Sequence, residues 1–437
     1  MLKQFSIVLG ICLLAITNGV VGSILKTPTA LVVFDPIFDN LEDLSSVDSN
    51  ILGMIKHLKE KYEVQFKPYS DEDLSLFEEG DRKFEHLVLL PPSKKAIVSK
   101  KTFNQHQLLE FINNEGNIFV VGDSRSALPE EIRSFLNELG IYPSPKNFKL
   151  IDHFNTVNGK VQLTEKNVEN SRILKSLNVE YDGSAALISN NEMLFPIIRS
   201  SKTAFSSDAQ EVISQQSTWS FGEQGFMAVG MQALNNARLV WVGSPSLVCN
   251  DLLDWTFQEK NVLKLKFVQH FKSEVPEIVN PSLYRITDPV TYTIGVSELV
   301  NGSWVPFTVK DIEDTLQLSF KMLDPYQRLN LQPLGPVAST EGSNELDAYA
   351  YFVQFKIPDH HGMFTFELDF KRHGLSYILD KKVVPVRHLA NDEYKRSWDI
   401  PNSWLYVASA VLVVLSWLAF IVNYIYIGNV NYKKKNI

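Results

Sequence analysis

The chain has 437 residues, of which 45% are hydrophobic and 21% are charged, and its formal net charge is −8 at pH 7. Lys3 and three lysines near the C-terminus supply four positive charges, so the region between them carries about −12, which argues against nucleic acid or anionic lipid as the main partner. Cys12 and Cys249 are the two cysteines of the sequence.

The N-terminus has the pattern of a secretory signal peptide. Lys3 precedes the apolar run Phe5–Ile16, and small residues follow in the string TNGVVGS. We expect cleavage between Gly19 and Ser23, so that residues 1–22 are removed and the remaining chain enters the secretory pathway. Cys249 is then left without an internal disulfide partner, and the luminal domains must fold around large apolar cores.

Apolar runs alternate with amphipathic segments up to about residue 275, which predicts a luminal α/β domain at 23–275. The expected strands are Thr29–Asp35, His86–Pro92 and Asn117–Asp123, and the expected helices are Ser49–Tyr62, Phe103–Gly116 and the segment from Pro129 to Gly140. This alternation is typical of a mostly parallel, flavodoxin-like or Rossmann-like sheet that is covered on both faces. The run Ala237–Ser244, with a helix expected near Asp254–Phe271, can return to the same sheet.

Beyond Pro276 apolar and polar residues alternate without helical segments between the runs. The runs are TYTIGVSEL, LQLSFKML, YAYFVQFKI, MFTFELDF and SYILDKKVVPV, and turn signals lie at Asn301-Gly302, Pro358-Asp359 and His373-Gly374. The pattern predicts an antiparallel, immunoglobulin-like β-sandwich at 276–390. Leu334–Asn344 is expected to be a polar loop.

The C-terminal part of the chain has the pattern of a membrane anchor. Residues 404–427 contain no charged residue and would form a helix about 36 Å long, enough to span a bilayer. Trp404 and Tyr406 lie at one of its ends and Tyr424 and Tyr426 at the other, as is typical of the two membrane interfaces. We therefore expect a single-pass type I protein with a juxtamembrane linker at 391–403 and a cytosolic tail at 428–437 that carries the lysines.

Three polar strings could carry chemistry, and a structural role suits each better. Adjacent residues on one strand point to opposite faces, so His360 and His361 cannot easily bind one metal ion, and their string is better explained as a polar hairpin turn. Asp152 at a strand end resembles a cap. Ser124 in VVGDSRS lacks both an identifiable base and a G-x-S-x-G motif. We expect no catalytic, cofactor-binding or metal-binding residue.

Several strings occur in the same order as in one known family, ahead of a single membrane helix and a lysine-rich tail. They are LSLFEEG with HLVLLPPS, LIDHFN, NARLVWVGS, YRITDPVTY, NGSWVPF, VQFKIPDHHGMFTFELDFKRHG and VPVRHLANDEY. The chain thereby resembles the 48 kDa subunit of the eukaryotic oligosaccharyltransferase, which is called the wheat-germ-agglutinin-binding subunit in yeasts. The segment Glu165–Glu223 matches least, so its fold is the least constrained.

The resemblance implies a non-catalytic accessory subunit of an endoplasmic reticulum complex. That complex transfers a preassembled oligosaccharide from dolichol pyrophosphate to asparagine in Asn-x-Ser/Thr sequons, and a separate multi-spanning subunit performs the chemistry. The implied partners are that catalytic subunit, a ribophorin II-like subunit and a small defender-against-cell-death-like subunit. No cofactor is implied for this chain.

Two other classes of protein remain open from the sequence. One is a membrane-anchored hydrolase related to amidotransferases, which would need a nucleophile at a strand-to-helix turn. The other is an early-secretory cargo receptor or chaperone, which would copurify with changing cargo.

Two features of the sequence predict sites that have no catalytic role. Lys434 and Lys435 stand fourth and third from the C-terminus, the dilysine spacing that cytosolic retrieval coats read. Asn301 begins the sequon NGS in a predicted turn and is expected to carry a glycan.

Ser409, Ser416 and Asn423 are spaced by seven residues in the membrane segment. This spacing places them on one stripe of a helix. Small and polar residues favour contact between helices in lipid, so we expect the stripe to face a partner subunit.

Overall fold

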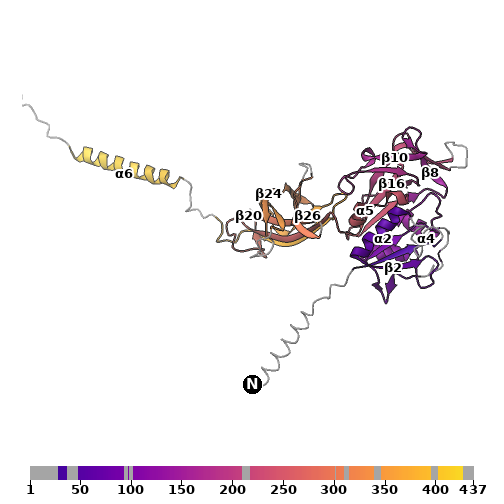
Figure 1. The fold of residues 1–437 in the computed structure, drawn as a ribbon. Coiled ribbons are helices and arrows are strands. Elements are labelled where there is room, and N and C mark those ends of the chain that lie inside the picture. The colour runs from indigo at the N-terminus through magenta and orange to yellow at the C-terminus, as the bar shows by residue number, and fades with distance from the viewer. Residues whose placement is uncertain are drawn as a thin grey trace, which may run out of the picture.

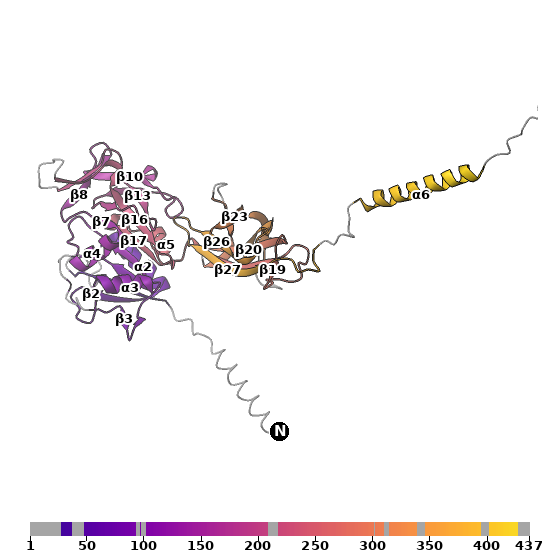
Figure 2. The same cartoon turned by 180° about the vertical axis from the view of Figure 1, so that it is seen from behind.

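The computed structural model describes residues 28–36, 48–92, 97, 102–208, 217–300, 302–309, 314–338, 346–394 and 402–426 (Figure 1). These residues form a mixed α/β domain, a β-rich domain and a C-terminal apolar helix, α6 (Ser403–Ile425). Both views show the β-rich domain on one side of the α/β domain, with the chain leaving its opposite end toward α6 (Figure 2). At this level the predicted architecture is confirmed.

A nine-stranded sheet forms the centre of the α/β domain. Its strands, in spatial order, are β2 (Glu63–Pro68), β1 (Thr29–Phe34), β5 (His86–Leu89), β6 (Asn117–Val121), β17 (Arg238–Val242), β16 (Phe226–Gln232), β12 (Ala186–Ile188) and β7 (Ile141–Pro143), with β13 (Leu194–Arg199) also paired to β16. The pairs from β2 to β17 are parallel, whereas the pairs beyond β17 are antiparallel, so the sheet is mixed. The later apolar run thus returns beside β6 as β17.

Helices cover both faces of this sheet, as the continuous apolar strands require. The helices α2 (Ser49–Lys61) and α5 (Asn250–Thr256) share one apolar core with the sheet, and α3 (Gln105–Asn113) and α4 (Glu130–Leu139) share the other. Local signals set their ends. Asn104 accepts a hydrogen bond from the backbone N–H of Gln107 at 3.0 Å and caps α3. Gly140 ends α4 with φ of 95°, in the left-handed region that glycine adopts without strain.

Small sheets and single-turn helices complete this domain. They are β3 (Phe77–Glu78) with β4 (Asp81–Arg82); β8 (Phe148–Ile151) with β14 (Phe205–Asp208) and β15 (Thr218–Phe221); β9 (Thr156–Val157) with β10 (Lys160–Thr164) and β11 (Asn178–Tyr181); and the 3₁₀ turns η1 (Glu165–Asn167), η3 (Gly222–Gln224) and η4 (Pro245–Leu247). The described regular structure in the segment with the weakest resemblance therefore consists of short strands and 3₁₀ turns.

The β-rich domain consists of two sheets. One contains β18 (Val262–Lys272), β20 (Pro289–Val300), β25 (Ala348–Lys356), β24 (Gln332–Val337) and β21 (Ser303–Pro306); the other contains β19 (Tyr284–Arg285), β27 (Ile378–Arg387), β26 (Gly362–Phe370), β22 (Gln317–Lys321) and β23 (Pro325–Asn330). All pairs are antiparallel except the short pair β19 and β27. Rings from both sheets share one core, for example Tyr292 stacked on Phe366 with centroids 5.6 Å apart.

The helix that we expected near Asp254–Phe271 is wrong. The chain forms the short helix α5 and then the strand β18, which pairs with β20. Gln258 and Asn261 have φ of 61° and 59°, so the backbone turns in the left-handed region between the two elements. The string VLKLKFVQHFK alternates with a period of two, and pairing with β20 decides its conformation.

Two predictions about turns in the β-rich domain also need correction. The strands β25 and β26 belong to different sheets, so the segment with Pro358 and Asp359 crosses between sheets and is not a hairpin turn. Leu334–Asn344 was expected to be a loop, but β24 extends through Val337 and pairs with β25. Cross-strand pairing outweighs the glycine and the two prolines of β24 at the edge of the sheet.

Candidate functional site

The strings that could carry chemistry serve local structure. The Ser124 hydroxyl donates to the Asp123 carboxylate at 3.3 Å, and Arg125 forms an ion pair with the same carboxylate at 3.0 Å. His360 lies against the ring of Tyr326, whereas His361 lies against His388, so the two histidines face different neighbours. Among the described residues, no group of three or more His, Cys, Asp or Glu side chains is placed to hold a metal ion.

Asp152 is the centre of a buried cap, as the sequence predicted. Its carboxylate accepts hydrogen bonds from the Phe154 N–H at 3.0 Å, the Asn155 amide at 2.9 Å and the Thr203 hydroxyl at 2.9 Å, and also from Ser201. Burial raises the pKa of Asp152, but these donors outweigh burial and lower the pKa to about 2. The ionised carboxylate therefore joins the loop after β8 to the loop before β14.

The α/β domain and the β-rich domain are joined by hydrogen bonds that span their boundary. Trp255 on α5 donates its indole N–H to the carbonyl of Gly374 at 2.9 Å, and Gln232 on β16 donates to the carbonyl of Leu375 at 2.9 Å. The backbone N–H of Tyr377 donates to Asn236 at 2.7 Å. These contacts fix the turn between β26 and β27 against the edge of the α/β domain.

An arginine–aspartate–arginine group strengthens the same boundary. Asp314, just before β22, accepts from the Arg372 guanidinium at 2.6 Å and also pairs with Arg172 of the α/β domain. Burial raises the pKa of Asp314, but the hydrogen bonds from both arginines hold it below its usual value. The carboxylate therefore remains ionised between two cations and links the domains electrostatically.

The connector between the domains is held by a fully buried arginine. Arg238 at the start of β17 donates to the carbonyls of Trp255, Lys260 and Asn261 at 2.7, 2.8 and 2.8 Å. Its guanidinium also lies 4.7 Å from the Trp255 ring, a cation–π contact. Burial lowers its pKa to about 9, so the side chain stays protonated at neutral pH.

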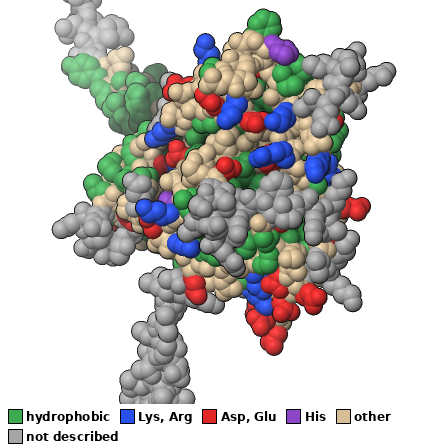
Figure 3. All heavy atoms as spheres, turned by 45° about the vertical axis from the view of Figure 1, so that its right-hand side comes forward, with side chains coloured by type: hydrophobic (Ala, Val, Ile, Leu, Met, Phe, Trp, Pro, Cys, Tyr) green, Lys and Arg blue, Asp and Glu red, His purple; other side chains and the backbone are tan. Residues whose placement is uncertain are grey.

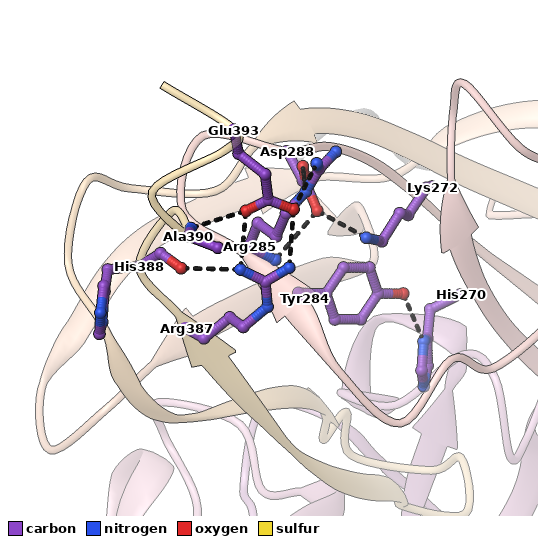
Figure 4. Close-up of polar contacts among 9 residues, drawn as sticks. All are labelled: His270, Lys272, Tyr284, Arg285, Asp288, Arg387, His388, Ala390 and Glu393. Atoms are coloured by element: carbon purple, nitrogen blue, oxygen red, sulfur yellow. Dashed lines mark hydrogen bonds and ion pairs between the residues drawn. The ribbon is translucent and has the colours of Figure 1, made fainter. Parts of the chain in front are cut away.

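A second polar network lies at the opposite end of the β-rich domain, where the chain leaves for α6 (Figure 4). Arg387 binds the Glu393 carboxylate in a bidentate pair at 2.7 and 2.8 Å, and Arg285 reaches the same carboxylate at 3.2 Å. Asp288 accepts from Arg285 at 3.1 Å and pairs with Lys272 at 2.9 Å. We call these five residues the juxtamembrane cluster.

The juxtamembrane cluster folds the chain after β27 back onto the domain. The side-chain hydrogen bonds from Arg387, together with one from the Ala390 N–H at 2.8 Å, hold the pKa of Glu393 well below its usual range. Bidentate pairing fixes the relative orientation of both planar groups. The last residues that the structure describes before α6 therefore have a defined position on the domain.

The cluster unites two strings that carried the family resemblance, YRITDPVTY and VPVRHLANDEY. Sequence reasoning recognised both strings and missed their contact. A signal was present in the first string, because Arg285 and Asp288 are opposite charges three residues apart just before a long strand. For Arg238 the signal was a charged residue at the start of the otherwise apolar run RLVWV.

Of the other predicted sites, the structure describes the polar stripe of the membrane segment but not the glycosylation site or the dilysine signal. Ser409, Ser416 and Asn423 all lie on α6, and the Ser409 hydroxyl donates to the carbonyl of Tyr406 one turn earlier at 2.8 Å. Asn301, Lys434 and Lys435 lie outside the described residues, as do the expected signal peptide and the cytosolic tail.

The fold and these networks define a two-domain protein that has one helix, among the described residues, long and apolar enough to cross a membrane. Residues 25–276 match the family model described as the OST48 N-terminal domain, and residues 270–428 match the OST48 middle domain. The chain therefore belongs to the OST48 family, and the resemblance predicted from the sequence is confirmed.

Curated relatives match over most of their length. A Saccharomyces cerevisiae protein named dolichyl-diphosphooligosaccharide–protein glycosyltransferase subunit WBP1 is 34% identical over 97% of this chain and 96% of its own. The Schizosaccharomyces pombe subunit of the same name is 30% identical over 82% of this chain and 85% of its own. A Caenorhabditis elegans protein named the 48 kDa subunit of that transferase is 29% identical over 88% and 90%.

Proposed function

We propose that this chain is an accessory, non-catalytic subunit of the oligosaccharyltransferase complex of the endoplasmic reticulum membrane. The complex transfers a preassembled oligosaccharide from dolichol pyrophosphate to sequon asparagines, and this subunit supports its assembly or stability. The observation that carries the proposal is the 34% identity, over 97% of the chain, to a protein named as a subunit of that transferase. The structure supports a scaffolding role, because the polar groups of the strings considered for chemistry are engaged in local hydrogen bonds and ring contacts.

The partners that we propose are a ribophorin II-like subunit, a small defender-against-cell-death-like subunit and the catalytic multi-spanning subunit. We also propose a type I topology, with both domains in the lumen, α6 in the bilayer and the tail in the cytosol. The length and apolarity of α6 support this arrangement. Lys434 and Lys435 would then be exposed to a cytosolic retrieval coat, and Asn301 would face the enzymes of the lumen.

The finer description of the fold is also a proposal. The order of the parallel strands, β2-β1-β5-β6-β17, supports a flavodoxin-like half of the α/β domain. The core shared by the two antiparallel sheets supports a sandwich. The division at 23–275 and 276–390 stays a prediction. Because β18 pairs with β20 of the β-rich domain, we propose that the boundary between the domains lies in the connector between Gln258 and Asn261.

The stripe of Ser409, Ser416 and Asn423 remains our proposed contact with a partner helix. The local hydrogen bond of Ser409 satisfies its hydroxyl within α6, so Asn423 is the residue that most needs a partner in or near the bilayer. Single-cysteine crosslinking in the native membrane tests the face. Capture of another subunit from Leu412 and Ile421 positions, with only lipid-phase labelling at Ser409 and Ser416, would show that the opposite face is used.

Copurification tests the subunit role. The full-length chain, tagged and expressed in its native host, is extracted in a mild detergent and assayed for transfer of oligosaccharide to an acceptor peptide. We expect a fixed set of partners and transferase activity, with an unrelated tagged type I protein as the control. Recovery with changing cargo and without activity would contradict the proposal. Substitution Ser124→Ala should leave the activity per complex unchanged, and a loss without loss of assembly would indicate a catalytic role instead.

A further inference from the structure

The β-rich domain has two distinct ends, because its long strands run from one to the other. Phe370 pairs with Ile378 at the end that contacts the α/β domain. Gly362 pairs with Val386 at the opposite end, and the juxtamembrane cluster lies there too. The β22–β23 hairpin turn also lies at this second end, since Lys321 pairs with Thr365 near the start of β26. We call this second end the exit end.

Exposed apolar side chains gather at the exit end. They are Val275, Ile278, Val279 and Leu283 between β18 and β19; Met322, Leu323 and Tyr326 at the β22–β23 turn; Met363 at the start of β26; and Tyr394 after the juxtamembrane cluster. Leu323 at the tip of its hairpin is 90% exposed, which is unusual for a leucine in a turn. On the face of the α/β domain seen in Figure 3, hydrophobic side chains are interspersed with charged ones. Large exposed apolar side chains that gather at one end of a domain indicate a site of interaction.

The chain length limits how far the exit end can lie from the anchor. Tyr394 is nine residues before Ser403, the first residue of α6. Nine residues span at most about 30 Å when fully extended, and a flexible linker of that length averages roughly half of this distance. With α6 in a bilayer, the exit end therefore lies close to the luminal membrane surface.

The charges at the exit end favour an apolar contact over an ionic one. The carboxylates of Asp288 and Glu393 are paired with the arginines and the lysine of the juxtamembrane cluster. These groups satisfy one another, whereas the acids Glu274, Glu277 and Asp324 are exposed beside the apolar side chains, so the exit end does not attract anionic lipid. Leucine, methionine and tyrosine are side chains that partition into the interfacial layer of a bilayer, and tyrosine favours that layer in particular.

We propose that the exit end is a second membrane contact, which inserts its apolar side chains into the interfacial layer of the luminal leaflet of a neutral bilayer. This inference rests on the proposed placement of α6 in the bilayer and not on the subunit role. The insertion fixes the tilt of the β-rich domain relative to the membrane, because a body held at α6 alone could pivot about its linker. Both domains, joined through Asp314 and Trp255, then stand at a defined angle above the membrane.

A matched pair of exposed residues on adjacent strands provides the test. Met363 is 56% exposed at the exit end, and Leu379 is 55% exposed toward the other end of the same sheet. The register places them about 20 Å apart along the strands. Each is changed to cysteine in the full-length protein with Cys249→Ser, labelled with an environment-sensitive fluorophore and placed in phosphatidylcholine nanodiscs, with and without nitroxide-labelled lipid. The same is done for Leu323→Cys, and for Leu412→Cys on α6.

We expect blue-shifted emission at Met363→Cys and Leu323→Cys, with lipid quenching several times larger than at Leu379→Cys. Equal, weak quenching at Met363→Cys and Leu379→Cys overturns the inference. Blue-shifted emission that appears only in the intact complex, without lipid quenching, also overturns it and identifies a protein interface instead. Absence of quenching at Leu412→Cys overturns both this inference and the membrane anchor, whereas failed copurification bears on the subunit role alone.

Discussion

Replacement of Arg238 by methionine tests how the connector between the domains is held. Methionine keeps most of the buried aliphatic volume but removes the donors to the carbonyls of Trp255, Lys260 and Asn261. Each buried carbonyl that loses its partner costs about 1–3 kcal/mol. Removal of a buried charge offsets part of this loss, because its desolvation no longer opposes folding. We expect a net decrease of about 3 kcal/mol in the free energy of unfolding.

Thermal unfolding of the full-length protein in detergent, followed by tryptophan fluorescence, measures this effect. A loss of about 3 kcal/mol corresponds to a decrease in Tm of about 6–12 °C for a domain of this size. Arg328→Met is the matched control, because Arg328 is exposed on β23 and its loss should change stability by less than about 0.5 kcal/mol. Arg238→Lys should be intermediate, since a single ammonium cannot reach all three carbonyls with the geometry of a guanidinium.

The reasoning is refuted if Arg238→Met unfolds within about 1 kcal/mol of the original protein. It is also refuted if Arg238→Lys is as stable as the original protein, because fork geometry would then be irrelevant. Limited proteolysis supplies an independent readout. The connector between α5 and β18 should be cleaved faster in Arg238→Met than in Arg328→Met, even at temperatures where both proteins are folded.

Four further outcomes follow from the same structure. Asp152 has a pKa of about 2 in the folded protein, below its unfolded value of about 4, so its contribution to stability is present above about pH 4 and is lost as the pH falls toward 2. Asp152→Ala should lower the free energy of unfolding by about 2–4 kcal/mol at pH 7, and the difference between the two proteins should shrink when unfolding is measured at acid pH. Asp314→Ala leaves two arginines facing each other and should destabilise the boundary between the domains by about 1–2 kcal/mol. The effect should be detected as unfolding at a lower temperature and as faster proteolytic cleavage between the domains. A reporter that carries the C-terminal segment should leave the endoplasmic reticulum when Lys434 and Lys435 are changed to serine, and unchanged localisation would contradict the retrieval signal. Asn301→Gln should increase gel mobility to that of the endoglycosidase-treated protein, and an unchanged mobility after digestion would rule out a glycan.

Hydrophobic periodicity predicted the elements whose burial is decided locally. The strands β1, β5 and β6 are continuous apolar runs, and α2 and α4 have apolar residues at helical spacing, so each could be placed to within a few residues. The strand β18 was missed, because a helix was extended through it from the residues of α5. The decisive interaction, pairing with β20, joins residues that are far apart in the sequence.

The networks that define the site could not be predicted, because they depend on tertiary contacts. Glu393 meets Arg285 across more than a hundred residues of sequence. Asp314 meets Arg172 across a still longer separation. Charged residues of this kind are common on protein surfaces, and only the fold decides which of them meet. Asp152 was placed correctly as a cap, since two of its donor residues, Phe154 and Asn155, lie within three residues of it in the loop.

The strands β26 and β27 run the full height of the β-rich domain, so the domain acts mechanically as a short lever arm. With nine and ten residues they span about 30 Å, from the juxtamembrane cluster to the joint with the α/β domain. A rocking motion of about 10° at the membrane would displace that joint by about 5 Å, and the far side of the α/β domain by more. With the exit end on the bilayer as proposed, a small change in the tilt of the β-rich domain would be amplified into a large change in the position of the α/β domain above the membrane.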